Sequence, residues 1–260
     1  MPFNINTEIS KACTLPSQFY LDHQYYDFCL KNIFPESWQL ITDRGALQNN
    51  NIYPFTFLEN SINEPLVITK TSNEIHCLSN VCTHRGHIIN KKACQSKKMK
   101  CQYHGRTFNI DGTMEKMPGF EGVKNFPGKN DNLKKLPILH WKDFTFTSIN
   151  PKIEITNVLN DIDNRLKDFP FDDIAYSYPY SKTYYINANW ALYCENYLEG
   201  LHVPFVHKSL TNEINIKSYK TELLNNGALQ YTHSKKDDIY AYYYWIFPNL
   251  MLNFYNWGLS

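Results

Sequence analysis

The sequence predicts an α+β protein in which a small all-β unit is inserted into an α+β domain built from both ends of the chain. Residues 38–150 predict the β unit, because they consist of short apolar runs separated by turn residues, and Asp111-Gly112 lies between two such runs as a strong hairpin signal. The flanking parts mix segments of helical apolar spacing with further strand-like runs. We therefore expect a helical N-terminal part at 1–37, the β unit at 38–150 and an α+β part at 151–260.

Three segments have the apolar spacing of amphipathic helices. The first covers residues 16–34 and is expected to end at Pro35, which cannot donate a helical hydrogen bond. Two further helices are predicted at 153–169 and 191–203.

Strand-like runs occupy much of the remaining C-terminal part. A strand is predicted at 181–190, and the aromatic-rich tail at 223–260 is predicted to form strands and turns. Asp237-Asp238 is expected in a turn between two of these strands.

The composition excludes several classes of function. With 26 basic and 25 acidic residues among 260, the chain has no overall field that would indicate nucleic acid or a membrane surface as a partner. It shows no secretory signal pattern, and no stretch approaches the roughly 18 apolar residues of a membrane span. Its seven cysteines, an odd number, are better explained as thiols or metal ligands than as disulfides. These observations predict a cytoplasmic protein.

The stretch VCTHRGHIINKKACQSKKMKCQYHGRTF concentrates soft metal ligands. Cys82-x-His84 is followed after 16 residues by Cys101-x-x-His104. Two thiolates and two imidazoles can form a tetrahedral zinc site, or they can hold a [2Fe–2S] cluster with both cysteines on one iron and both histidines on the other. Each histidine is followed within two residues by a glycine, which permits a tight turn of the backbone around a cluster.

CTHRG and CQYHG resemble the CxHRG and CxYHG boxes of Rieske proteins. The resemblance implies a [2Fe–2S] cluster held by the four cysteine and histidine residues of the two motifs. Cys94 and His87 do not match ligand positions, and we expect an unligated thiol and a structural or surface residue there. The family commonly continues the second box with an aromatic residue, whereas this chain has Arg106, which is expected to change the surface beside the cluster.

A second motif, NWALYCENYLEGLHVPFVH, covers Asn189–His207. Glu199 and His202 are three residues apart and would share a face of a helix. His202 and His207 are five apart, so a regular α-helix would point them about 140° apart. Pro204 between them favours a widened, π-like turn that would bring both histidines to one side. The alternative is a chance pair of core histidines.

The second motif resembles the mononuclear-iron segment of Rieske non-haem iron oxygenases, which reads roughly NWK…EN…(D/E)xxHxxxxH. The resemblance implies that His202 and His207 are the histidines of a 2-His-1-carboxylate iron site. It also implies that Glu199, more often Asp in the family, links His202 to the cluster ligand His104 of the partner subunit in a homotrimer. A glutamate at this position occurs in the branch that oxidises quaternary ammonium compounds, and the many aromatic residues could form a cage for such a cation or a pocket for a planar ring.

The third iron ligand is not identified. No carboxylate that follows His207 has a matching context, neither Glu213, Glu222, Asp237 nor Asp238. We expect this ligand beyond Ser260, with the chain corresponding to the first two-thirds to three-quarters of an α subunit and truncated at its C-terminus. By resemblance, the Rieske domain would then be inserted in an incomplete helix-grip-like (START-like) catalytic domain.

The resemblance as a whole implies the terminal component of an oxygenase. Electrons from an NAD(P)H-dependent flavin/iron–sulfur reductase or a ferredoxin would reach a mononuclear Fe(II) through the cluster, and O₂ would be activated to hydroxylate an aromatic ring or a quaternary ammonium compound. No GxGxxG fingerprint occurs, so the nucleotide is expected on a partner. The alternatives are a Rieske electron-transfer protein, which would need only the β unit, and a truncated, catalytically inactive homologue.

Overall fold

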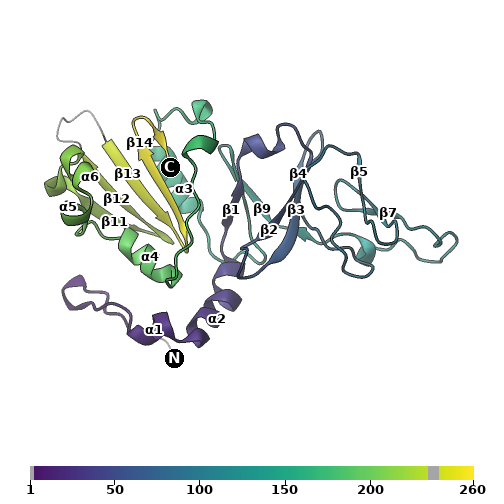
Figure 1. Ribbon diagram of the computed structural model, residues 1–260, viewed down its shortest axis with the longest axis horizontal. Helices are drawn as coiled ribbons and strands as arrows, with labels where there is room; N and C mark the ends of the chain where they lie inside the picture. Colours follow the sequence, from purple (N-terminus) through teal and green to yellow (C-terminus); the bar gives the residue numbers. More distant parts are fainter. Residues whose placement is uncertain (1–2, 234–239) are drawn as a thin grey trace. The chain divides into compact units, whose positions relative to one another are not determined.

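The structure is a computed structural model that describes residues 3–233 and 240–260 (Figure 1). It divides into two compact units. We call them the terminal unit, made of Met1–Phe34, Ile155–Lys167 and Pro179–Ser260, and the middle unit, made of Pro35–Glu154 and Asp168–Tyr178. In these described ranges, no helix is both long enough and apolar enough to cross a membrane.

The middle unit is built from antiparallel strands, as predicted. Its strands are β1 (Gln39–Thr42), β2 (Ile52–Phe57), β3 (Glu64–Lys70), β4 (Ile75–Ser79), β5 (Lys98–Lys100), β6 (Thr107–Asn109), β7 (Met114–Lys116), β8 (Lys135–Leu136), β9 (Ile138–Trp141) and β10 (Phe144–Thr147). They form three sheets, in the orders β2-β3-β4-β8, β5-β6-β7 and β1-β10-β9. Among its 3₁₀ helices, η3 (Arg44–Leu47) connects β1 to β2 and η4 (Lys129–Asp131) connects β7 to β8. Two others lie outside the run of strands: η2 (Phe34–Glu36) precedes β1, and η5 (Phe171–Asp173) follows β10.

A buried apolar cluster joins two of these sheets. Ile52 and Val67 of the β2–β3 pair pack with Met99 of β5, and all three are 0% exposed. Burying such a side chain contributes about 1.5–3 kcal/mol. The same cluster contains Cys82 and Cys101, so both predicted cysteine ligands are anchored in one core.

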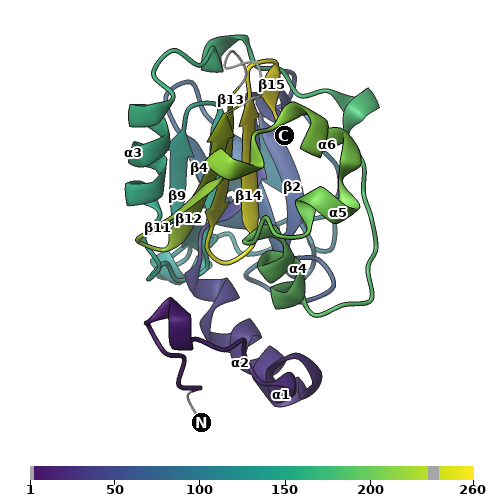
Figure 2. The same cartoon turned by 90° about the vertical axis from the view of Figure 1, so that its left-hand side faces the viewer.

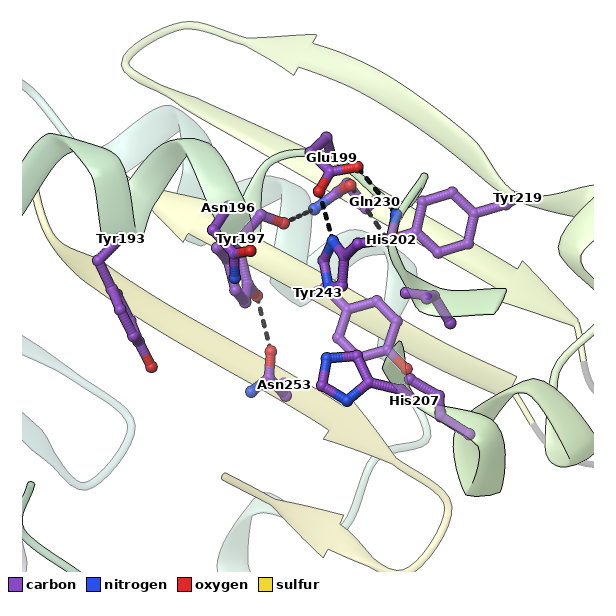
Figure 3. A pocket seen from close by; sticks show the side chains of 12 residues that line it. Tyr193, Asn196, Tyr197, Glu199, His202, His207, Tyr219, Gln230, Tyr243 and Asn253 are labelled. Atoms are coloured by element: carbon purple, nitrogen blue, oxygen red, sulfur yellow. Dashed lines mark hydrogen bonds and ion pairs between the residues drawn. The ribbon is translucent and has the colours of Figure 1, made fainter. Parts of the chain in front are cut away.

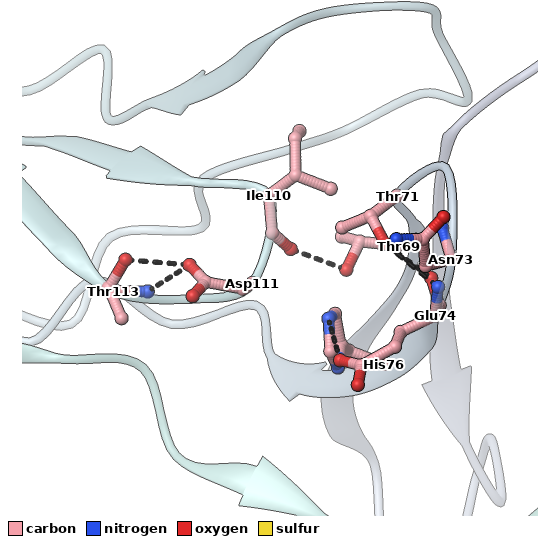
Figure 4. A network of polar contacts seen from close by, with 8 residues as sticks. All are labelled: Thr69, Thr71, Asn73, Glu74, His76, Ile110, Asp111 and Thr113. Atoms are coloured by element: carbon pink, nitrogen blue, oxygen red, sulfur yellow. Dashed lines mark hydrogen bonds and ion pairs between the residues drawn. The ribbon is translucent and has the colours of Figure 1, made fainter.

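The predicted Asp111-Gly112 hairpin forms between β6 and β7 (Figure 4). Asp111 Oδ1 accepts hydrogen bonds from the backbone N–H of Thr113 at 3.0 Å and from its hydroxyl at 2.6 Å. Gly112 has a φ of +86°, which favours glycine. The hydroxyl of Thr69 donates to the carbonyl oxygen of Ile110 at 2.6 Å and ties the turn to β3.

The terminal unit contains one five-stranded antiparallel sheet and several helices. The strands follow one another in chain order as β11 (Lys220–Leu224), β12 (Gly227–His233), β13 (Tyr240–Ile246), β14 (Leu250–Tyr255) and β15 (Gly258–Leu259). The helices are η1 (Ile9–Lys11), α1 (Ser17–Leu21), α2 (His23–Asn32), α3 (Thr156–Arg165), η6 (Tyr178–Tyr180), α4 (Trp190–Tyr197), α5 (Val203–Val206), α6 (Lys208–Glu213) and η7 (Ile216–Ser218). The tail strands and the helix predicted at 153–169, observed as α3, are confirmed.

The sheet of the terminal unit is covered on both faces (Figure 2). Neighbouring side chains of β13 point to opposite sides. Tyr244 donates its hydroxyl to Asp161 of α3 at 2.7 Å, whereas Tyr243 lines a pocket with Tyr193 of α4 and Leu210 of α6. Helix α3 therefore lies on one face, and the segment α4–α6 forms a pocket on the other.

Two predictions in the terminal unit were wrong for local reasons. The helix predicted at 16–34 is split into α1 and α2, because the Asp22 side chain accepts the backbone N–H of Gln24 at 3.0 Å and caps a new helix. The strand predicted at 181–190 does not form; Tyr185 within it is 92% exposed and pairs with no described strand.

The helix predicted at 191–203 was also too long. Helix α4 ends at Tyr197. The Glu199 carboxylate then accepts hydrogen bonds from the backbone N–H groups of Leu201 and His202, which would bond to backbone carbonyl oxygens if the helix continued. The predicted turn at Asp237-Asp238 lies outside the described residues.

We expect Gly112→Ala to destabilise the protein by about 2–4 kcal/mol. Its Cβ would lie 2.9 Å from Leu78 Cδ2 and would also occupy a left-handed backbone position. Gly119→Ala is the matched control, since Gly119 has a φ of +79° with no atom within 4 Å of a Cβ. Urea unfolding of both variants measures the difference, and equal losses would show that the Leu78 contact costs nothing.

Candidate metal centres

The two ligand-rich loops of the middle unit fold as equivalent turns. The N–H of Gly86 donates to the carbonyl oxygen of Cys82 at 3.0 Å, and the N–H of Gly105 donates to that of Cys101 at the same distance. Both glycines are left-handed, with φ of +72° and +75°. The backbone thus repeats one geometry, although cysteine and histidine are two residues apart in one loop and three apart in the other.

These turns bring the four predicted ligands together as two pairs. Cys82 and Cys101 are 3% and 2% exposed and lie in the same buried cluster. His84 is half-buried and His104 exposed, with ring centroids 4.9 Å apart. The thiol pair faces the core and the imidazole pair lies at the surface. This is the pairing that a [2Fe–2S] cluster requires, with two protein ligands on each iron.

The local electrostatics suit ligation. Burial raises the pKa of the Cys82 thiol, so the thiol stays neutral until a metal replaces its proton. Desolvation, with His104 and Arg106 nearby, lowers the pKa of His84 and favours the neutral imidazole that binds metals. Across residues 3–233 and 240–260, no group of three or more His, Cys, Asp or Glu side chains is arranged to hold a single metal ion.

The prediction that Arg106 alters the surface was wrong, because its side chain is 4% exposed. Nη1 donates to Thr83 Oγ1 at 2.6 Å, and Nη2 donates to Asp131 Oδ1 at 3.1 Å. The Thr83 hydroxyl in turn donates to the carbonyl oxygen of Asp131 at 2.7 Å. Arg106 therefore links the second loop to the first from within the protein.

In the terminal unit, Glu199, His202 and His207 gather at one pocket (Figure 3). Glu199 Oε1 is hydrogen-bonded to Nδ1 of His202, and the ring centroids of the two histidines are 5.1 Å apart. A carboxylate can only accept, so Nδ1 carries the proton and Nε2 keeps its lone pair for a metal. Desolvation opposes ionisation of Glu199, but hydrogen bonds from His202 and Leu201 outweigh it and lower the pKa of the carboxyl group.

The predicted π-like turn between the two histidines is wrong. Val206 N–H donates to the His202 carbonyl at 2.9 Å and His207 N–H donates to that of Val203 at 3.0 Å, which is ordinary α-helical spacing. Pro204 lies in the first turn of α5, where its missing N–H costs nothing. The chain leaves helical geometry at His207, with φ −107° and ψ 68°, before α6 begins. This break, rather than a widened turn, brings the rings together.

The pocket at these histidines is small and largely aromatic. Its volume is about 180 Å³, below the roughly 300–1,000 Å³ of sites for drug-sized ligands. Four tyrosines line it together with the two histidines and Glu199: Tyr193, Tyr197, Tyr219 and Tyr243. No lysine or arginine is among its described lining residues.

Sequence reasoning missed the polar residues that shape the wall of the pocket. Gln230, 1% exposed, donates from Nε2 to the Tyr197 carbonyl at 2.6 Å and accepts from the Tyr219 hydroxyl at 3.1 Å. The Tyr197 hydroxyl donates to Asn253 Oδ1 at 2.6 Å. A glutamine within the otherwise apolar start of GALQYTH was the available signal, since a buried amide needs partners.

The downstream carboxylates do not complete a three-ligand group within the described chain. Glu222 is paired with Arg165 at 2.5 Å and accepts the Tyr231 hydroxyl at 2.8 Å. Asp237, Asp238 and the side chain of Glu213 lie outside the described residues.

Comparison with known families matches both units. Residues 37–127 match the Rieske [2Fe-2S] domain, and residues 172–259 match the catalytic domain of the ring hydroxylating alpha subunit.

Curated relatives include chloroplastic choline monooxygenases. That of Arabidopsis thaliana is 27% identical over 97% of this chain and 64% of its own length. That of Spinacia oleracea is 29% identical over 94% of this chain and 58% of its own length. The carnitine monooxygenase oxygenase subunit of Escherichia coli K12 is 24% identical over 97% and 70%. The chain thus spans about 60% of the length of the choline monooxygenases it matches.

Solved structures agree on the fold. A quaternary ammonium Rieske monooxygenase has a TM-score of 0.79 at 23% identity, covering 93% of this chain and 68% of that one. Naphthalene 1,2-dioxygenase from Rhodococcus has a TM-score of 0.73 at 17% identity, covering 92% and 64%. The chain carries a Rieske [2Fe-2S] domain and the catalytic domain of a ring-hydroxylating α subunit, one after the other in the sequence.

Proposed function

We propose that this chain is the terminal component of a Rieske oxygenase that hydroxylates a small quaternary ammonium compound. The observation that carries the proposal is the presence in one chain of a paired thiol and imidazole site and of a separate histidine pair beside an aromatic pocket. An electron carrier would need only the first of these. We assign the cluster to the domain at 38–150, with Cys82, His84, Cys101 and His104 as its ligands. We assign the mononuclear iron to the domain at 151–260, with His202 and His207 as its ligands.

In this proposal each residue at the second site has a separate task. His202 and His207 would hold iron. Bound iron would supply the activation of O₂, with electrons delivered from the cluster. Glu199 keeps the His202 ring oriented and its Nδ1 protonated. The Glu199 side chain is 41% exposed and His104 is exposed, so this carboxylate is accessible to His104 of the partner subunit in a homotrimer. A separate NAD(P)H-dependent reductase or ferredoxin would deliver the electrons.

The chemistry of the pocket supports a cationic substrate. Burial raises the pKa of Tyr219 to about 12 and puts those of Tyr197 and Tyr243 further above the ordinary value, so all three phenols are neutral at physiological pH. Neutral rings attract a quaternary ammonium group through their π faces. The relatives named for choline and carnitine point in the same direction.

We expect reconstitution with iron and sulfide to yield a rhombic Rieske-type EPR signal on reduction, with two tightly held irons per chain. Cys101→Ser should abolish the signal. Cys94→Ser is the matched control, because Cys94 lies in the same loop region, packs against the same core and is not among the paired ligands. A reduced protein without this signal, or its loss in Cys94→Ser, would refute the ligand assignment. A third iron held as tightly would show that more than two histidines bind it.

We expect His202→Ala and His207→Ala to lose at least 100-fold in O₂-dependent product formation while keeping the cluster EPR signal, because the iron loses a ligand. His233→Ala is the control, an exposed histidine in β12 outside the pocket. Oxygen uptake is measured with choline-like amines and with aromatic acids. Retained turnover in either ligand variant would refute the iron site, and uptake with aromatic acids alone would refute the substrate class.

We expect stability to fall between about pH 10 and 12 partly through Tyr219. Its folded pKa of about 12 exceeds the ordinary value of 10, mainly through desolvation, so this contribution is complete below pH 10 and is lost as pH rises through 12. It amounts to at most about 2–3 kcal/mol. Tyr219→Phe should flatten the fall in the urea unfolding free energy, whereas Tyr185→Phe, at a 92% exposed position, should follow the wild-type curve. Parallel curves for Tyr219→Phe and wild type would contradict the assignment.

A further inference from the structure

The guanidinium of Arg106 is a buried charge with incomplete compensation from protein. The Arg106 side chain is 4% exposed. Its ion-pair partner Asp131, whose Oδ1 lies 3.1 Å from Nη2, is 25% exposed. Its Nε is buried without a hydrogen-bond partner among the described residues. Burial of an ionised group with an unsatisfied donor is costly unless further negative charge lies nearby.

This charge lies between the two ligand loops. Nη1 is 2.6 Å from the hydroxyl of Thr83, the residue between Cys82 and His84. The carbonyl oxygen of Arg106 accepts the N–H of Cys101 at 2.8 Å, so its backbone belongs to the second loop. The ring of Phe126 lies 5.6 Å from the guanidinium carbon and helps to cover it. The same side chain therefore ties the loops together and places a cation next to ligands from both.

A cluster at this site would change charge by one unit on reduction. Two ferric ions, two sulfides, two thiolates and two neutral imidazoles sum to zero, and addition of one electron from the donor makes the sum −1. A nearby cation stabilises the reduced form, and it does so more strongly when it is shielded from water. We propose that Arg106 is a positioning residue that raises the reduction potential of the cluster through its buried charge and holds the two loops in register, an inference that rests on the cluster assigned above.

The test is an EPR-monitored redox titration of the reconstituted full chain. We expect Arg106→Gln to lower the equilibrium constant for one-electron reduction about tenfold, a downward shift of about 59 mV. Arg85→Gln is the matched control: it removes the same charge beside His84, but at an exposed position where water screens it, and should change the constant less than about threefold. Arg106→Lys keeps the charge and should stay within about threefold of wild type, while it loses iron to a chelator faster because one loop contact is missing.

A further variant reverses the sign of the effect. Asp131→Asn removes the counter-charge and leaves Arg106 in place, so the reduction potential should rise; this measurement decides the matter if Arg106→Gln fails to fold or to hold a cluster. An unchanged potential in Arg106→Gln, equal shifts in Arg106→Gln and Arg85→Gln, or a potential that does not rise in Asp131→Asn would overturn the proposal. These results differ from failure of the function proposed above, which would appear as wild-type protein without a Rieske signal.

Discussion

The arrangement of the ligand loops depends on one repeated backbone hydrogen bond, from a glycine N–H to the carbonyl oxygen of a cysteine. In both loops the glycine that makes this bond is left-handed, a conformation that side chains disfavour. At Gly105 the constraint is also steric, since a Cβ would lie 3.1 Å from Pro118. The backbone thereby directs each cysteine to the core and leaves each histidine near the surface. Arg106 can then connect two loops that already share a geometry.

The burial of the cysteines and the exposure of the histidines matter for electron transfer. In the cluster assignment proposed above, the buried thiols would keep one iron away from water, while His84 and His104 lie at the surface of the middle unit. In the terminal unit, the Glu199 carboxylate holds His202 and is itself partly exposed. Each unit therefore presents the polar end of its own site to solvent. Such accessible imidazole and carboxylate groups suit a hydrogen-bonded contact between subunits, whereas buried ones would require rearrangement before contact.

The sequence predicted the features that depend on local chemistry. The β unit, the Asp111-Gly112 turn and the tail strands follow from alternation and turn residues, and the paired spacing of cysteine and histidine is visible in the letters alone. The errors arose where a side chain overrides periodicity, as when Asp22 caps a helix or the carboxylate of Glu199 takes backbone N–H groups. The burial of Arg106 could not be predicted from the sequence, because its hydrogen-bond partners Thr83 and Asp131 are distant along the chain.

The source of affinity for a cation can also be argued from the pocket. Both oxygens of Glu199 already accept hydrogen bonds, one from the His202 ring and one from the backbone. These donors within the protein partly compensate the negative charge of the carboxylate. In the function proposed above, attraction for a quaternary ammonium group would then come largely from the tyrosine faces, at about 0.5–2 kcal/mol for each suitably placed ring. Hydrogen bonds to Gln230 and Asn253 fix the positions of two of these rings, Tyr197 and Tyr219. For the substrate class proposed above, preference would therefore depend on the orientation of these rings more than on net charge.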